Sequence, residues 1–310
     1  MSTYPFRLIN TENDEQLKDK NLLRGRTSKA MGFSFQEDAR RFVAGEELEI
    51  AINTAIAVGE PLLLTGEPGT GKTQVAYYAA YKLNLEPVIH FQVRSDSIAK
   101  DLLYHFDTVR YFHDAHLRRQ DELPDKNNYV EPRALWEALE SEGPRVLLID
   151  EIDKAPREFP NDLLHESDKM EFKILETGKI VRGSHENRPI IFITSNSERR
   201  LPEPFLRRCV YHHITFDRDL LDKAVKKRTD EYPGLSEEFL DMAIDRFIAL
   251  REFTLRKRPS TGELLVWLRV LGLNADHYSK YLDENLSELP YLGVLIKDHQ
   301  DREDLERRRF

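Results

Sequence analysis

A glycine-rich run at 66–73 constrains the fold of this 310-residue chain more than any other feature. The apolar segment 61–65 before it predicts a buried strand, and the segment 74–83 after it predicts a helix. Glycines let successive backbone N–H groups converge on one phosphate, and the N-terminus of the following helix adds partial positive charge. In such a loop a lysine reaches the β- and γ-phosphates, and the next hydroxyl binds Mg²⁺. The run therefore predicts a nucleotide-phosphate site made of Gly66, Glu67, Pro68, Gly69, Thr70, Gly71, Lys72 and Thr73.

Polar residues follow two further apolar segments of strand type. Asp150 and Glu151 come at the end of the segment that starts at residue 146, and Asn196 ends the segment that starts at residue 189. Apolar strands of this kind are typical of a parallel sheet covered by helices, and ligands bind at the carboxyl ends of its strands. We expect Asp150 to bind Mg²⁺ together with Thr73, Glu151 to polarise an attacking water, and Asn196 to orient that water.

The order of the predicted elements indicates an α/β fold with a five-stranded parallel sheet flanked by helices. Strands are predicted at 61–65, 87–93, 146–151, 189–196 and 210–216. From residue 217 the apolar residues recur at helical spacing, which predicts a smaller, all-helical lid domain. We predict an N-terminal extension at 1–41, a nucleotide-binding domain at 42–216 and the helical domain at 217–310.

Several other segments carry clear local signals. Residues 46–58 predict a helix that stops at Gly59, and residues 98–117 have a helical period. The polar stretch 118–128 predicts an insertion, and the alternating pattern of 172–182 predicts a hairpin that turns at Thr177 and Gly178. The mixed charges of 301–309 predict a solvated helix.

Composition restricts the class of protein. Hydrophobic residues make up 40% of the chain and charged residues 33%, which is typical of soluble globular proteins. The net charge of -9 argues against a dominant surface for nucleic acid or anionic membranes. The chain has neither a signal-peptide pattern nor a run long enough to span a bilayer, so we expect a cytoplasmic protein without membrane insertion.

Cysteine and histidine give little support for a metal centre. The single cysteine, Cys209, excludes an internal disulfide and a zinc site built on paired thiolates. His113 and His116 have the spacing of two ligands on one helix, but the sequence suggests no third ligand nearby.

Taken in order, these motifs resemble those of an AAA+ ATPase. The resemblance rests on 66–73, 147–153, 194–196 and 201–208, and it covers roughly residues 42–270. Within that superfamily, the segments 62–73, 150–156 and 201–208 are similar to signatures of the MoxR branch.

The resemblance implies a role for each motif residue. Asp150 and Glu151 match the Walker B pair, and Asn196 matches sensor 1. Arg208 is the better match for an arginine finger that completes the site of a neighbouring subunit, and Arg207 is the second candidate.

The resemblance also implies ligands and partners. Phe42 and Val43 fall where the family packs the adenine base, and the hairpin at 172–182 looks like the insertion that this group carries before sensor 1. ATP and Mg²⁺ are the expected ligands, and a homohexameric ring is the expected assembly. Proteins of this branch remodel other proteins like chaperones, often beside partners with a von Willebrand factor A domain.

The chain departs from the family pattern at sensor 2. The family carries an arginine where this chain has Gly262, and Arg256, Lys257 or Arg258 could take its place. The sequence also contains no aromatic-hydrophobic-glycine pore loop, so it does not predict the threading of unfolded chains.

Three functions are consistent with these features. The first is an ATP-hydrolysing remodeller of a protein partner. The second, suggested by Gly262, is an assembly or switch module that ATP binding closes and slow hydrolysis resets. The third is a nucleic-acid motor based on the arginines at 207–208 and in 251–258, against which the acidic balance argues. GTP is a less expected substrate than ATP, because the chain lacks the sensor motif of the AAA+ branch that uses GTP.

Overall fold

The computed structural model describes residues 35–85, 87–117, 123–273, 282 and 285–307. The extension predicted at 1–41 falls mostly outside the described residues, as does the 118–122 part of the predicted insertion. Internal contacts divide the chain into two compact units. One consists of Ala44–Gly66 and Lys72–Thr215, and the other of Glu67–Gly71 and Phe216–Phe310 with the chain up to Val43.

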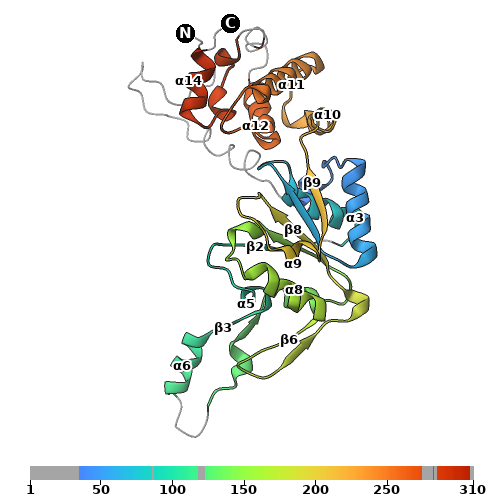
Figure 1. The fold of residues 1–310 in the computed structure, drawn as a ribbon, viewed down its shortest axis with the longest axis vertical. Helices are drawn as coiled ribbons and strands as arrows, with labels where there is room; N and C mark the ends of the chain where they lie inside the picture. Colours follow the sequence, from blue (N-terminus) through green and yellow to red (C-terminus); the bar gives the residue numbers. More distant parts are fainter. Residues whose placement is uncertain (1–34, 86, 118–122, 274–281, 283–284, 308–310) are drawn as a thin grey trace. The chain divides into compact units, whose positions relative to one another are not determined.

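The first of these units is built on a five-stranded sheet in the order β2-β5-β8-β1-β9 (Figure 1). All neighbouring strands run parallel, which confirms the predicted α/β class with a parallel sheet. The three central strands are almost wholly apolar, because helices cover both faces of the sheet. The strands span Leu62–Gly66 (β1), Ile89–Gln92 (β2), Val146–Asp150 (β5), Ile190–Ser195 (β8) and Val210–Ile214 (β9).

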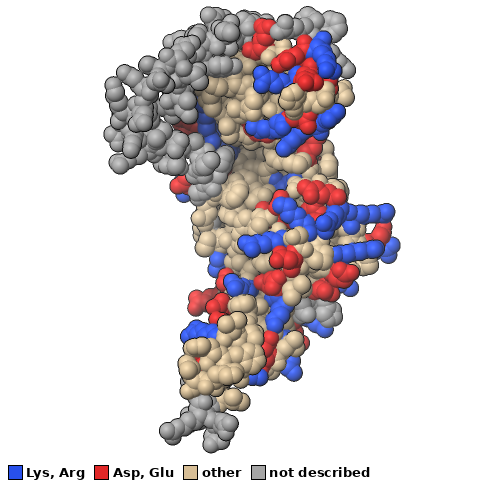
Figure 2. Space-filling view, turned by 90° about the vertical axis from the view of Figure 1, so that its left-hand side faces the viewer, with Lys and Arg blue, Asp and Glu red and all other residues tan. Residues whose placement is uncertain are grey.

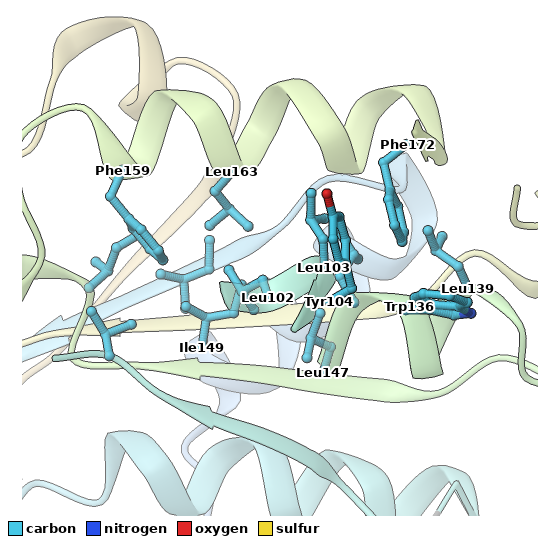
Figure 3. Packing of buried hydrophobic residues seen from close by; sticks show 14 of the residues in the cluster. Leu102, Leu103, Tyr104, Trp136, Leu139, Leu147, Ile149, Phe159, Leu163 and Phe172 are labelled. Carbon is cyan, nitrogen blue, oxygen red and sulfur yellow. The ribbon is translucent and has the colours of Figure 1, made fainter. Parts of the chain in front are cut away.

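Helices pack on this sheet and fix β5 in place. The helix α4 contacts β1, β5 and β8, and α7 contacts β2 and β5. Phe159 and Leu163 of α8 point toward the side chains of β5, where Leu147 and Ile149 are buried (Figure 3). Each buried side chain of this size contributes about 1.5–3 kcal/mol. The packing therefore holds the strand that ends in Asp150 rigidly. The helices of this unit are α3 (Glu46–Val58), α4 (Lys72–Leu83), α5 (Lys100–Leu103), α6 (Thr108–Leu117), α7 (Ala134–Leu139), α8 (Phe159–Lys169) and α9 (Glu203–Leu206).

The helix before the first strand begins and ends as predicted. Gly59 caps α3 in the left-handed conformation, with φ of 72°. Its N–H donates to the carbonyl of Ala55 at 3.0 Å, a bond that stabilises the last turn. The glycine permits this backbone conformation at little steric cost, and the chain turns directly into β1.

The single helical segment predicted at 98–117 is wrong. The chain forms α5, then the short strand β3, and only then α6. Tyr104 explains the break: its ring is buried and stacks on Phe172, and its hydroxyl donates to Glu176 at 2.7 Å. Contacts between segments distant in sequence thus outweigh the local helical period. The strand β3 (Tyr104–Phe106) pairs antiparallel with β4 (Val130–Pro132), and the predicted 172–182 hairpin is confirmed as β6 (Glu171–Lys173) and β7 (Ile180–Arg182).

The second unit is helical, and its described residues contain no strand. Ser236 and Ser260 cap helices as predicted, and Ser260 forms a capping box with Glu263. Trp267 lies at the centre of the apolar core, and its indole N–H donates to the carbonyl of Pro290 at 2.6 Å. No described helix of the chain has the length and hydropathy of a bilayer-spanning segment. The helices of this unit are α2 (Phe35–Ala39), α10 (Arg218–Lys226), α11 (Glu237–Glu252), α12 (Thr261–Gly272) and α14 (His299–Arg307).

The C-terminal helix differs from the predicted solvated tail. Asp301 and Leu305 of α14 are buried, with exposed fractions of 1% and 4%. The carboxylate of Asp301 accepts from the backbone N–H groups of Arg256 at 2.9 Å and Lys257 at 3.1 Å. The helix is therefore part of the folded unit. The mixed charges of the segment could not predict that the helix packs on the unit, because only Asp301 and Leu305 are buried.

Replacing Asp301 by alanine should destabilise this unit. The change leaves two backbone N–H groups without their acceptor, so the free energy of unfolding should fall by about 1–3 kcal/mol. Asp304→Ala on the same helix is the matched control, since its side chain is 44% exposed, and its effect should stay within about 0.5 kcal/mol. Urea denaturation measures both variants, and equal midpoints would contradict the buried role of Asp301.

Candidate active site

The predicted phosphate loop lies between β1 and α4. Lys72, the first residue of α4, is 7% exposed and donates from Nζ to the carbonyl oxygen of Gly66 at 2.9 Å. Burial lowers the pKa of the Lys72 ammonium, and the negative charges of Asp153, Asp150 and Glu151 oppose that shift. The ammonium is thus held at the loop with its charge balanced by nearby acids, as a phosphate-binding lysine requires.

A glycine is required at the tip of the loop. The backbone of Gly69 has φ of +76°, and a Cβ there would lie 2.4 Å from the Cβ of Ser260. Non-bonded carbon atoms do not approach so closely, so a side chain at this position would force the loop or Ser260 to move. Because glycine has no side chain, it permits both the positive φ and the close approach, and the N–H groups of the tip stay free of steric hindrance toward a phosphate.

Phe42 lies against the same loop. Its ring atom Cε2 is 3.2 Å from the position that a Cβ on Gly71 would occupy. Neighbouring polar contacts hold this segment: Arg41 donates to Glu231 at 2.6 Å, and Lys227 lies 3.5 Å from the carbonyl of Phe42. Val43, the other residue expected beside the adenine base, is half-buried.

Two of the predicted magnesium ligands meet directly. The Thr73 hydroxyl donates to Asp150, with Oγ1 at 3.0 Å from Oδ1 and 3.2 Å from Oδ2. A hydroxyl and a carboxylate this close can bind one Mg²⁺, which usually takes one or two protein oxygens and completes its shell with phosphates and water. Among the described residues, no three His, Cys, Asp or Glu side chains are grouped as a metal centre. The Thr73–Asp150 donor pair fits a nucleotide-bound Mg²⁺. Within the part of the chain that the structure describes, His113 and His116 have no third ligand.

Asp150 is held as a charged acceptor. It is 6% exposed, and Thr194 donates to its Oδ1 at 2.5 Å. His90 Nε2 lies 3.4 Å from Oδ2, and the other ring nitrogen of His90 is 3.0 Å from the hydroxyl of Tyr77. Burial alone would raise the pKa of the Asp150 carboxyl, but hydrogen bonds from His90, Thr194 and Thr73 outweigh it and lower the pKa. A carboxylate that stays ionised is what a cation site needs.

Glu151 sits in a strained backbone conformation directly after β5. Its φ of 62° is uncommon for a residue with a side chain, and its N–H donates to Thr194 Oγ1 at 2.8 Å. Three side chains contact its carboxylate. Gln92 donates to Oε2 at 2.7 Å, Asn196 donates to Oε1 at 3.2 Å, and Lys154 pairs with Oε2. The contact with Glu151 raises the pKa of the Lys154 ammonium.

Asn196 reaches Glu151 because the loop after β8 is anchored. Buried Asp153 accepts from the backbone N–H of Asn196 at 3.3 Å and of Glu198 at 2.9 Å. The structure therefore brings the two predicted water-handling residues, Glu151 and Asn196, into direct contact.

The two arginine-finger candidates follow α9. The Arg207 side chain is 81% exposed and pairs with Glu203 of the same helix at 3.5 Å. Arg208 is also exposed, and its N–H donates to the carbonyl of Phe205 at 3.1 Å. Both side chains face outward at the turn into β9, as a residue that acts on another subunit must.

The loop tip has a basic neighbour that the sequence did not predict. Arg251 of α11 is 8% exposed and donates to Glu67 Oε2 at 2.6 Å. Its guanidinium also lies 4.0 Å from the centre of the Phe216 ring and donates to the carbonyl of Pro259. Helical period places Arg251 on the apolar stripe of α11, but only the fold reveals its acidic partner.

The three arginine and lysine residues considered for sensor 2 have different positions. Arg258 Nη1 lies 3.6 Å from Glu67 Oε1, at the loop tip. Arg256 and Lys257 use their backbone N–H groups to bind Asp301. Gly262 lies in the first turn of α12, and a Cβ added there would lie 3.9 Å from the Ser260 hydroxyl oxygen.

Gln92 and His90 are site residues that the sequence analysis missed. Both lie on β2, and the parallel register places Gln92 opposite Asp150. Residues two apart on a strand share a face, so both can reach the acids at the end of β5. The sequence alone shows that His90 and Gln92 lie on the same face of a strand. It does not show that this strand pairs with β5, and that pairing is what makes both residues part of the site.

The arrangement has the parts of a nucleotide-hydrolysing site. Glycines and an ammonium can hold phosphates, Thr73 and Asp150 can hold Mg²⁺, and Glu151 with Asn196 can bind and polarise a water. Bound Mg²⁺ would neutralise charge on the phosphates.

Comparison with known proteins agrees with this geometry. Residues 61–209, just under half of the chain, match the model of the AAA domain (dynein-related subfamily). No curated protein matches the chain. Among solved structures, it is similar to a "putative ATPase" from Cytophaga hutchinsonii, with 15% identity over 93% of this chain and 98% of that one. The TM-score of 0.41 is too low for that likeness to support any functional statement. The family match agrees with the AAA+ resemblance of the sequence: residues 61–209 match an AAA domain, and the parallel sheet of this segment is of the P-loop α/β type.

Proposed function

We propose that this chain is a MoxR-type AAA+ ATPase that hydrolyses ATP to remodel a protein partner. One observation carries the proposal: Lys72, Thr73, Asp150, Glu151 and Asn196 gather at the carboxyl ends of β1, β5 and β8. Binding phosphates would need only the first three. The acid–amide pair of Glu151 and Asn196 adds the means to activate water, which favours hydrolysis over binding alone.

The surface favours a protein partner over nucleic acid. The net charge is -9, and on the face shown in Figure 2 the Lys and Arg side chains are interspersed with Asp and Glu. A nucleic-acid motor would need a continuous basic track along the phosphate backbone. On α6, Val109 and Phe112 are 81% and 55% exposed, which suits contact with protein. We include a von Willebrand factor A domain protein among the candidate partners and the cytoplasm as the compartment.

A captured complex tests this function. The Glu151→Gln variant should retain ATP without hydrolysing it, so it should hold its partner on an affinity resin when Mg·ATP is present. Lys72→Ala, with weakened nucleotide binding, is the matched control. The proposal predicts that a partner protein is retained on the resin by the Glu151→Gln variant with Mg·ATP and is not retained by the Lys72→Ala variant. Identical sets of retained proteins, or retention of nucleic acid alone, would contradict it.

We further propose that the active form is a homo-oligomeric ring, a hexamer by the family resemblance. Exposed Arg208, with Arg207 as the second candidate, would complete the site of the next subunit. Mixing two inactive variants tests this. Arg208→Ala keeps an intact nucleotide site, Lys72→Ala keeps an intact finger, and their mixture should regain ATPase activity. A mixture as inactive as its components would argue that the finger does not act between subunits.

A second candidate is a nucleotide-gated switch with slow hydrolysis. Two observations favour it: Gly262 stands at the sensor 2 position, and three side chains contact the Glu151 carboxylate. Rapid turnover by the isolated protein would exclude this candidate. Slow turnover together with ATP-dependent assembly would favour it over continuous remodelling.

A further inference from the structure

His90 contacts the carboxylate that is expected to bind Mg²⁺, and Tyr77 contacts His90. The Nε2 atom of His90 lies 3.4 Å from Asp150 Oδ2, and its Nδ1 atom lies 3.0 Å from the hydroxyl of Tyr77. An ionised carboxylate can only accept hydrogen bonds, so the ring nitrogen that faces Asp150 must carry a hydrogen. In the neutral imidazole the other nitrogen is then an acceptor, and the Tyr77 hydroxyl is its donor.

These contacts close a ring of side chains that begins and ends on α4. Thr73 and Tyr77 are four residues apart on this helix, so they lie on the same face. Thr73 contacts Asp150 directly, and Tyr77 reaches the same carboxylate through His90. Burial and the charge of Asp150 raise the pKa of the Tyr77 hydroxyl, so Tyr77 keeps the proton that it donates. The helix that begins with the phosphate-binding lysine therefore supports Asp150 in two places.

A donor from each neighbouring strand also holds one oxygen of this carboxylate. The strand β5 lies between β2 and β8. Thr194 of β8 donates to Oδ1 of Asp150 at 2.5 Å, and His90 of β2 faces Oδ2. A third donor, Thr73, is itself a predicted Mg²⁺ ligand. Groups that hold a metal ligand in this way fix its orientation, and their loss typically weakens metal binding 10- to 100-fold.

We propose that His90 is a positioning residue for Mg²⁺: it orients the Asp150 carboxylate, and Tyr77 fixes the imidazole in the tautomer that this contact requires. The inference rests on the proposed ATPase function, which supplies the nucleotide that brings the metal. The phosphates are bound by the 66–73 loop and its Lys72. Removal of His90 should therefore weaken binding of the metal and leave the metal-free binding of nucleotide unchanged.

Binding of Mn²⁺ to the full-length protein with ADP tests the inference without hydrolysis. Mn²⁺ accepts the same oxygen ligands as Mg²⁺, and its electron paramagnetic resonance signal reports the free ion. For His90→Ala we expect the Kd of Mn²⁺ in this complex to rise about 10- to 100-fold, whereas the Kd of ADP in EDTA should equal that of the wild type. The matched control is His105→Ala, an exposed histidine of β3, which should bind Mn²⁺ as the wild type does.

Two smaller changes separate positioning from a general loss of structure. His90→Gln can place an amide N–H near the position of the imidazole Nε2, so it should recover most of the Mn²⁺ affinity that the alanine variant loses. Tyr77→Phe removes only the hydroxyl, and its Kd for Mn²⁺ should rise about two- to tenfold, as expected for one hydrogen bond. The phenylalanine variant also carries the test if His90→Ala does not fold.

Two results would overturn the positioning role of His90. One is wild-type affinity for Mn²⁺ in both His90→Ala and Tyr77→Phe. The other is an equal loss of ADP affinity with Mn²⁺ and with EDTA, which would indicate damage to the whole site. In either case, phosphate release from ATP by the wild type would leave the proposed ATPase function standing. A wild type that binds ADP equally with Mn²⁺ and with EDTA, and releases no phosphate from ATP, would remove both proposals.

Discussion

Replacing Glu151 by glutamine should lower kcat for ATP about 10²- to 10⁴-fold, the range that a positioned general base contributes. The amide cannot take a proton from water, whereas it keeps the size of the carboxylate. Glu151 lies one residue beyond the Asp150 side chain that meets Thr73, and it touches neither Lys72 nor Thr73 through its described hydrogen bonds. Affinity for ATP should therefore stay within about threefold of the wild-type value.

The rate and the affinity have to be measured separately for this variant. Single-turnover hydrolysis reports the chemical step, and titration with a fluorescent ATP analogue reports binding. Glu186→Gln, an exposed acid in the turn before β8, is the matched control and should behave as wild type. A Glu151→Gln variant that hydrolyses ATP at the wild-type rate would show that another group activates the water.

Replacing Lys72 by alanine should remove most of the affinity for ATP. The buried ammonium is the cation that the loop offers to the phosphates, and a hydrogen bond to a charged group contributes about 1.5–3 kcal/mol, or roughly 10- to 150-fold in Kd. Loss of binding also removes stabilisation by ligand. Wild-type protein at an ATP concentration 100 times Kd should gain about 2.7 kcal/mol of unfolding free energy, and the variant should gain far less.

Thermal denaturation with and without Mg·ATP measures this second prediction. Lys82→Ala is the control on the same helix, because Lys82 lies in the last turn of α4 and is exposed. Its melting temperature should rise with ATP as that of the wild type does. An equal rise in the Lys72→Ala variant would mean that ATP binds somewhere other than the 66–73 loop.

Local sequence signals predicted the parts of the fold that depend on near neighbours. The helix stop at Gly59 and the cap at Ser260 lie where the sequence placed them, and β5 and β8 end at Asp150 and Ser195, one residue before their predicted ends. Each follows from an apolar run, a glycine or a capping hydroxyl within a few residues. Because parallel strands bring their carboxyl ends to one edge, the meeting of Asp150 with Thr73 also followed from the sequence.

The features that the sequence did not predict depend on contacts between distant segments. Tyr104 ends a helical period because it packs on Phe172, which is far along the chain. Gln92 becomes a site residue only through the pairing of β2 with β5. Arg251 looks like an ordinary arginine on a helix until the fold places Glu67 beside it. No local pattern encodes such pairs, since each partner alone fits a common surface or core position.

The most direct test of the central claim is phosphate release from Mg·ATP by the purified full-length protein, compared in one assay with Lys72→Ala prepared identically. The account predicts steady release by the wild type and release at least tenfold slower by the variant at the same subsaturating ATP concentration, in keeping with the loss of a charged contact to phosphate. Equal release by both proteins, or none by the wild type in the presence of Mg²⁺, would contradict a hydrolytic site at this loop.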